Sequence, residues 1–168
     1  DGYIPSANAP VDSDIKSDPP PNLVENGEDP WTSKMFELEG IMPGDSGAAS
    51  LELQNTGDNS TLLELQFLNL VDEPLITPEP EPTPDSGELS QKLDMLLWWD
   101  DNNNTIYDTG EHTIAQDTLK NIAGITYDLG SLNYMEIKYL GIAWSVDKSV
   151  GNEIMRARCT FDIQFSLP

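Results

Sequence analysis

The stretch from Met155 to Phe165 alternates apolar and polar residues without interruption. Its apolar members are Met155, Ala157, Cys159, Phe161, Ile163 and Phe165, and the residues between them are Arg156, Arg158, Thr160, Asp162 and Gln164. Successive side chains of a β-strand point to opposite faces of the sheet, so the pattern predicts a strand with one buried and one solvated face. Such a strand needs a second layer to cover its apolar face.

Shorter alternating runs earlier in the chain predict further strands. Phe36 and Leu38 alternate with glutamates, residues 43–47 are typical of a turn, and Leu51 and Leu53 continue the alternation. We expect a β-hairpin over this region.

A longer apolar run follows the hairpin region. Leu63, Leu65 and Phe67 share one face of the predicted strand, whereas Leu68 and Leu70 lie on the other face. This change of face indicates a bulge, or burial on both sides, near Phe67.

This longer run covers residues 61–71, and further strand signals lie at residues 93–99 and 134–146. Leu119 and Ile122 stand at the spacing of a single helical turn. The chain thus holds seven or eight predicted strands and almost no helix. We expect an all-β fold, an antiparallel β-sandwich whose sheet edges must be protected.

The 168 residues suffice for one sandwich domain, placed at 31–168, after an arm at residues 1–30. The arm holds six prolines and few large apolar residues, so it cannot bury enough apolar surface to order itself alone. It is either a disordered tail or a segment that becomes ordered against a neighbouring molecule. In the second case its anchors are Tyr3, Ile4, Val11 and Ile15.

Charge narrows the classes of partner. Thirty acidic residues against eight basic ones give a formal charge of −22. Nucleic acid and anionic membrane surfaces are therefore not expected as partners, because both are negatively charged themselves. Repulsion among the carboxylates also destabilises the compact state, and bound divalent cations or salt would relieve it.

Targeting and modification signals are few. No apolar run is long enough for a transmembrane helix and no basic, apolar leader is present, so an exported protein would already have lost its signal peptide. Cys159 is the only cysteine. An internal disulfide is excluded, and we expect a buried thiol, with pairing between chains as the alternative. Asn59 is a possible glycosylation acceptor, whereas the similar Asn103 lies in a loop where a glycan would obstruct ion binding.

That loop spans residues 100–111 and carries oxygen-bearing side chains at the spacing of a calcium loop. Places 1, 3, 5, 9 and 12 are Asp100, Asn102, Asn104, Asp108 and Glu111, and place 7 is Ile106. Place 7 offers only its carbonyl, so an apolar side chain is allowed there and could turn toward a core. Place 6 is Thr105 instead of the usual glycine, although this place often needs a positive φ. The alternative interpretation is an acidic, Asn-rich hairpin tip.

Other chemistry is poorly supported. His112 is the only histidine and belongs to no zinc-ligand motif, so we predict no enzymatic activity. Trp98 and Trp99 must point to opposite faces of a strand. We expect one in the core and the other free to stack on a sugar or to enter a subunit contact.

Several short motifs occur in a particular order. They are Phe36-x-Leu38, Met42-Pro43-Gly44-Asp45-Ser46-Gly47, Leu51-x-Leu53-x-Asn55-x-Gly57, Trp99-Asp100, Tyr107 to Glu111, Thr118-Leu119, Ala143 to Asp147, and Gly151 to Glu153. In order and spacing they resemble the landmarks of the TasA/camelysin family of exported fibre proteins, over about residues 34 to 166.

The resemblance implies a secreted jelly-roll sandwich that polymerises into extracellular filaments or tubes, as in a biofilm matrix. Assembly would proceed by donor-strand complementation, in which the arm of one subunit fills an open sheet edge of the next. Residues 3–15 are the expected donor strand, because the prolines at 19–21 could not join a ladder. The alternative function is a calcium-dependent extracellular module that binds carbohydrate or a cell surface.

Overall fold

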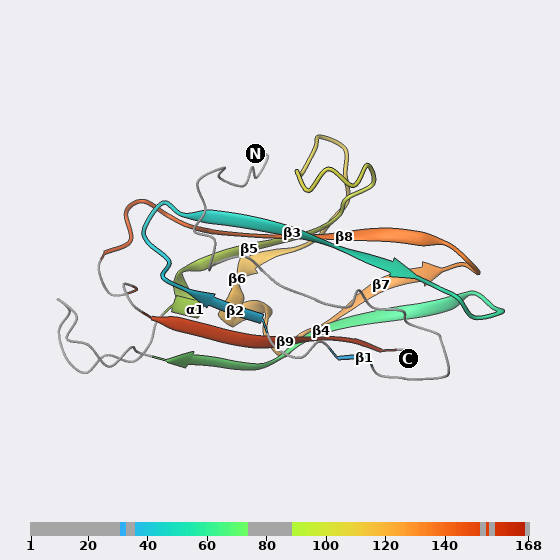
Figure 1. The fold of residues 1–168 in the computed structure, drawn as a ribbon, viewed down its shortest axis with the longest axis horizontal. Helices are drawn as coiled ribbons and strands as arrows, with labels where there is room; N and C mark the ends of the chain where they lie inside the picture. The colour runs from blue at the N-terminus through green and yellow to red at the C-terminus, as the bar shows by residue number, and fades with distance from the viewer. Residues whose placement is uncertain (1–30, 33–35, 74–88, 152–153, 155–156, 167–168) are drawn as a thin grey trace.

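The computed structural model describes residues 31–32, 36–73, 89–151, 154 and 157–166, and within them the chain forms two stacked antiparallel β-sheets (Figure 1). The strands are β1 (Trp31–Thr32), β2 (Phe36–Glu39), β3 (Ser46–Gln54), β4 (Thr61–Glu73), β5 (Leu93–Trp99), β6 (Thr113–Thr118), β7 (Thr126–Leu132), β8 (Ile137–Val146) and β9 (Arg158–Ser166). Two single-turn helices, α1 (Leu89–Lys92) and α2 (Leu119–Ile122), accompany them. The predicted all-β class is confirmed.

The strand order shows how the chain is wound. One sheet has the order β3-β8-β5-β6, and the other has the order β9-β4-β7 with both β1 and β2 paired to the outer side of β9. Among the described residues, β5 and β6 are the only consecutive strands that pair with each other. The long-range ladders therefore hold the sandwich together.

The predicted hairpin of residues 36–54 is wrong. β2 pairs with β9 in one sheet, whereas β3 pairs with β8 in the other. The predicted turn does exist, but it carries the chain between the sheets: Gly44 has a φ of +89°, and its N–H donates to the Val146 carbonyl of β8 at 2.9 Å. Alternation predicts a strand but not its partner, which explains the error.

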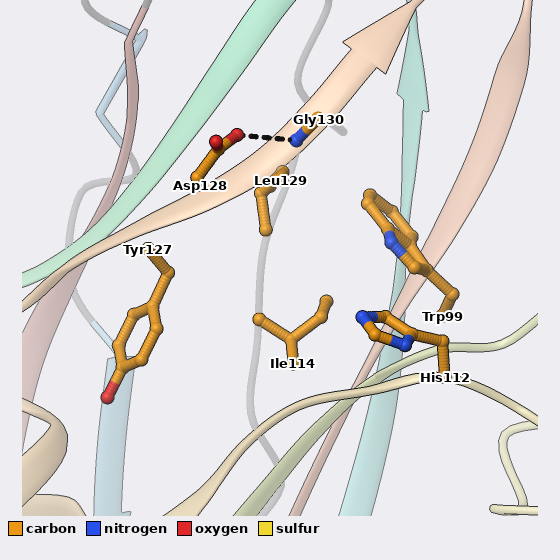
Figure 2. A pocket seen from close by; sticks show the side chains of 7 residues that line it. All are labelled: Trp99, His112, Ile114, Tyr127, Asp128, Leu129 and Gly130. Carbon is orange, nitrogen blue, oxygen red and sulfur yellow. Dashed lines mark hydrogen bonds between the residues drawn. The ribbon is translucent and has the colours of Figure 1, made fainter.

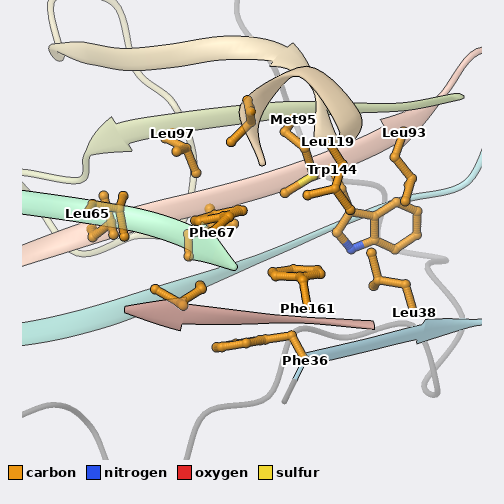
Figure 3. Close-up of a cluster of buried hydrophobic side chains, with 14 of the residues drawn as sticks. Phe36, Leu38, Leu65, Phe67, Leu93, Met95, Leu97, Leu119, Trp144 and Phe161 are labelled. Carbon is orange, nitrogen blue, oxygen red and sulfur yellow. The ribbon is translucent and has the colours of Figure 1, made fainter. Parts of the chain in front are cut away.

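The predicted alternation of the last strand is confirmed in β9. Cys159, Phe161, Ile163 and Phe165 are buried and the residues between them are partly exposed. Phe161 stacks between Phe36 and Phe67, with ring centroids 5.4 and 5.2 Å away (Figure 3). The predicted burial of the Cys159 thiol is also confirmed, and this burial raises its pKa above the usual value.

The bulge predicted near Phe67 is present in β4. The register against β9 shifts between Leu68 and Val71, where Asn69 has a φ of +54° and its Nδ2 donates to Asp162 Oδ2 at 2.8 Å. The predicted helical turn is α2, capped by the Thr118 hydroxyl. Sequence patterns missed β6 and β7, which are polar edge strands with little alternation.

Several expectations concern residues outside the described part of the chain. The arm at 1–30, with Tyr3, Ile4, Val11 and Ile15, is among them. None of the described helices is long and apolar enough to cross a bilayer.

Candidate functional site

The predicted ion loop connects β5 to β6 and projects from the sandwich (Figure 1). Two backbone hydrogen bonds fix its ends: Trp99 N–H donates to the His112 carbonyl, and Asp100 N–H donates to the Tyr139 carbonyl of β8, both at 2.9 Å. The loop thus starts and ends on a rigid sheet, which limits how far its side chains can spread.

Asp100 organises the first half of the loop. Asp100 is fully buried. Its two carboxylate oxygens accept the backbone N–H groups of Asn104 and Thr105 at 3.0 and 2.9 Å. Thr105 has a φ of +62°. The sixth place therefore has the left-handed backbone that such loops require, but with a β-branched residue that reaches it only with strain.

The side chains at places 3, 5 and 9 meet each other. Asn102 Nδ2 and Asn104 Nδ2 both donate to Asp108 Oδ2, at 2.8 and 2.7 Å. These two hydrogen bonds hold the pKa of the Asp108 carboxyl below its ordinary value. Three of the predicted oxygen-bearing side chains are therefore within hydrogen-bond distance of one another.

Glu111 closes the loop. Its Oε1 accepts the N–H of Asp101 at 3.0 Å, and its Oε2 accepts the N–H of Asp108 at 2.8 Å. The carboxylate at place 12 therefore reaches across to both halves of the loop.

The expectation for the side chain of Ile106 is wrong, because it is 39% exposed. The neighbouring Tyr107 turns inward instead. It meets the buried Trp98 edge to face, with ring centroids 6.1 Å apart, and its hydroxyl accepts a hydrogen bond from Thr113 Oγ1 at 3.1 Å. This contact anchors the loop to the outer face of the sheet.

The geometry of this loop favours cation binding in one respect and opposes it in another. Five oxygen-bearing side chains belong to one anchored loop, and hard cations prefer such ligands. Yet within the described ranges no three His, Cys, Asp or Glu side chains lie close enough together to hold a metal ion. The carboxylates are engaged by N–H groups of the loop, which a cation would have to replace. Calcium binding stays a prediction.

A cavity of about 320 Å³ opens beside the loop, between edge strands β6 and β7 (Figure 2). Its lining residues are Trp99, His112, Ile114, Tyr127, Asp128, Leu129 and Gly130. Trp99 and His112 are the residues that flank the loop. Asp128 turns aside to accept the Gly130 N–H at 2.8 Å, and the walls combine aromatic and apolar side chains with polar groups (Figure 2).

The predicted division of the two tryptophans is confirmed in part. Trp98 is fully buried on the outer face of its sheet, whereas Trp99 is partly exposed and packs against the core. The Lys138 ammonium lies 5.2 Å from the centre of the Trp99 ring. Sequence reasoning pointed to one of the two tryptophans as a possible sugar contact but gave His112 no role and missed the cavity, because Tyr127 and Leu129 come from the unpredicted strand β7.

Asn59 is exposed in the connection between β3 and β4, as an acceptor of a glycan would have to be. Asn103 is also exposed, at the tip of the ion loop with a φ of +54°. Both residues are exposed, and glycosylation of Asn59 stays a prediction.

Comparisons with known proteins add no family. No protein-family model matches the chain, and no curated protein matches it. The class that the fold defines is an antiparallel β-sandwich with an anchored acidic loop, and the TasA/camelysin resemblance rests on the sequence motifs alone.

Proposed function

We propose that the protein is a structural subunit of an extracellular filament, tube or matrix, in which an arm of one subunit adds a strand to an open sheet edge of the next. The observation that carries the proposal is that, among the described strands, each sheet ends in edge strands that pair on one side only. β3 and β6 border one sheet, and β7 and the β1–β2 side border the other. An open edge offers unpaired N–H and C=O groups to an extended segment of another chain.

The proposal includes a jelly-roll topology. The strand orders β2-β9-β4-β7 and β3-β8-β5-β6 support it. From β2 onward every connection crosses between the sheets except the one from β5 to β6. A jelly roll is a double sheet of eight strands built from two Greek keys, and this path of the chain supports the proposed topology.

Electron microscopy of the purified chain, with and without residues 1–20, tests assembly. We expect filaments or tubes from the full chain and none from the shortened one. Monomers in both samples across a range of calcium and salt concentrations would refute the proposal.

Calcium in the loop of residues 100–111 is the second part of the proposal. Binding to the folded state alone would add roughly 2.7 kcal/mol at a calcium concentration one hundred times the dissociation constant. We therefore predict that a chelator lowers the melting temperature. Asp100→Asn combined with Glu111→Gln should abolish this chelator effect, because both negative charges are lost, while each amide keeps one of the two oxygens that accept backbone N–H groups.

The matched control is Asp58→Asn combined with Asp101→Asn. It removes the same charge from exposed residues, one of them outside the loop and the other at a place that is not a predicted ligand. We expect the control to keep the full chelator effect. Equal losses in the two double variants would show general charge relief instead of a site.

The cavity beside the loop favours a second candidate function, a calcium-dependent carbohydrate-binding module. A sugar ring could stack on Trp99 while the loop orders the adjacent residues Trp99 and His112. This function predicts saturable binding of soluble oligosaccharides by the monomer, measured as a binding signal in isothermal titration calorimetry. Loss of the signal in Trp99→Ala, with Tyr134→Ala as an exposed aromatic control, would support it, and a flat titration of the wild type would remove it.

A further inference from the structure

We propose that β3 is the edge that accepts the incoming strand, and that its occupant is the uncharged segment of residues 2–11 of a second copy. This inference rests on the proposed function, because it specifies where subunits of the filament join. It follows from a comparison of the edges that the two sheets leave open.

Three of the edges carry features that protect a strand from pairing with another chain. β6 has only six residues, includes Asp117, and shifts register against β5 between Leu97 and Trp98. β7 includes Asp128 and a bulge at Gly130, whose φ is +78°. The β1–β2 side consists of two short pieces, and Glu37 lies on one of them.

β3 has fewer of these protective features. It is nine residues long and pairs with β8 at every position without a register shift. Its residues 46–51 carry no charged side chain, and Glu52 is the only charge in the strand. Within the part of the chain that the structure describes, residues 47–54 pair only with β8. A long, regular edge that carries no charge over residues 46–51 is the kind that accepts another strand.

Side-chain size and charge point to the occupant. Gly47, Ala48, Ala49 and Ser50 are small, so bulky side chains of an added strand would find room beside them. The segment of residues 2–11 offers Tyr3 and Ile4 and has no charged residue, in a chain with 30 acidic residues. A segment without acidic residues can approach β3 without charge repulsion. An acidic segment would be repelled by the negative surface of this protein.

Prolines limit the register of the added strand. Pro5 and Pro10 stand an odd number of residues apart, so their backbone nitrogens face opposite sides of an extended strand. Only one of the two proline nitrogens can face away from β3, where the missing N–H costs no hydrogen bond of the ladder. The ladder therefore runs through the residues between them and ends at one proline.

Cross-linking in assembled filaments tests the contact. In a Cys159→Ala background, full chains with Ala7→Cys are mixed with chains carrying Glu52→Cys on β3 or Gln116→Cys on β6, and treated with a short bis-maleimide. Glu52 and Gln116 are both exposed and both belong to the outward-facing positions of the same sheet, one on each of its edges. We expect a cross-linked dimer at least tenfold more abundant with Glu52→Cys. A dimer that forms equally well or better with Gln116→Cys overturns the choice of β3.

A second measurement separates this inference from the proposed function. Ser50→Lys should raise the protein concentration needed for assembly at least tenfold, while Gln116→Lys, with the same change in charge, should leave it within twofold of the wild type. The melting temperature of each monomer shows that both variants are folded. Filaments that are blocked by Gln116→Lys and not by Ser50→Lys overturn the role of β3 and leave the filament function standing. A wild-type chain that never assembles overturns both.

Discussion

Two glycines determine where the large indole rings of the β3–β8–β5 sheet can lie. Gly141 stands opposite Trp98 on the outer face, and Gly47 stands opposite Trp144 on the core face. A Cβ atom added at Gly141 would lie 2.3 Å from Trp98 Cε2, and one at Gly47 would lie 2.7 Å from Trp144 Nε1. Each ring therefore occupies the space that a side chain would take on the neighbouring strand.

We predict that Gly141→Ala destabilises the fold by about 1–3 kcal/mol, because the Trp98 ring must leave its position or distort β8. Urea denaturation measures the change in the free energy of unfolding. Adding Trp98→Leu should recover part of the loss, since the smaller side chain makes room for the methyl group. Additive losses in the double variant would contradict this explanation.

Thr105 gives a prediction of opposite sign. Its φ of +62° is costly for a β-branched residue, and Gly removes this strain at the cost of a more flexible unfolded chain. We expect Thr105→Gly to raise the free energy of unfolding by about 0.5–1 kcal/mol and to strengthen any calcium response. Thr113→Gly, in the strand that follows the loop, is the control and should lower stability.

At the scale of elements, β4 is an interior strand that is interrupted by a bulge. β4 pairs with β7 through its first half and with β9 from Glu64 to Glu73, and its register shifts once against each partner. The second register shift lies at Asn69. The apolar residues before and after it therefore contact different neighbours. Bulges bend and twist a strand in this way.

Asn69→Ala should destabilise the fold by about 1–2 kcal/mol, because Ala loses the hydrogen bond to Asp162 and does not favour a φ of +54°. Asn69→Gly loses only the hydrogen bond and should cost less. Urea denaturation of the two variants ranks them. Equal losses would mean that the backbone of Asn69 carries no strain.

At the scale of the whole molecule, a net charge of −22 destabilises the folded state, because like charges repel one another in the compact protein. Asp94 shows the effect locally: desolvation, with Asp147 and Asp117 nearby, raises the pKa of its carboxyl above 3.8. A carboxyl whose pKa is raised by folding favours the folded state at low pH. That contribution is lost as the pH rises from the unfolded value through the folded one.

We therefore predict that Asp94→Asn stabilises the protein by about 0.5 kcal/mol at pH 7 and low salt, and not at pH 3, where the carboxyl is already protonated. Thermal melts in chelator at both pH values measure this, and added sodium chloride should shrink the gain at pH 7. Asp58→Asn, in an exposed loop, removes the same charge and should gain less. An equal gain would assign the effect to net charge alone.

The local sequence predicted much of the fold. The alternation in β9, the strand β5, the bulge after Phe67 and the turn of α2 all depend on side chains that are close in sequence, so the pattern contains them. In the loop from Asp100 to Glu111, Asn102 and Asn104 lie within hydrogen-bond distance of Asp108, whereas calcium binding by this spacing stays a prediction. The spacing of residues along the chain is a local property, and folding does not change it.

The tertiary structure alone decided which strands are partners. Phe36 to Glu39 and Leu51 to Leu53 have the same alternation, yet they belong to different sheets because their partners, β9 and β8, come from the far end of the chain. The cavity beside Trp99 likewise exists only because β6 and β7 border opposite sheets on the same side of the sandwich. Side-chain periodicity specifies a buried face, but hydrogen bonding between distant strands selects what covers it.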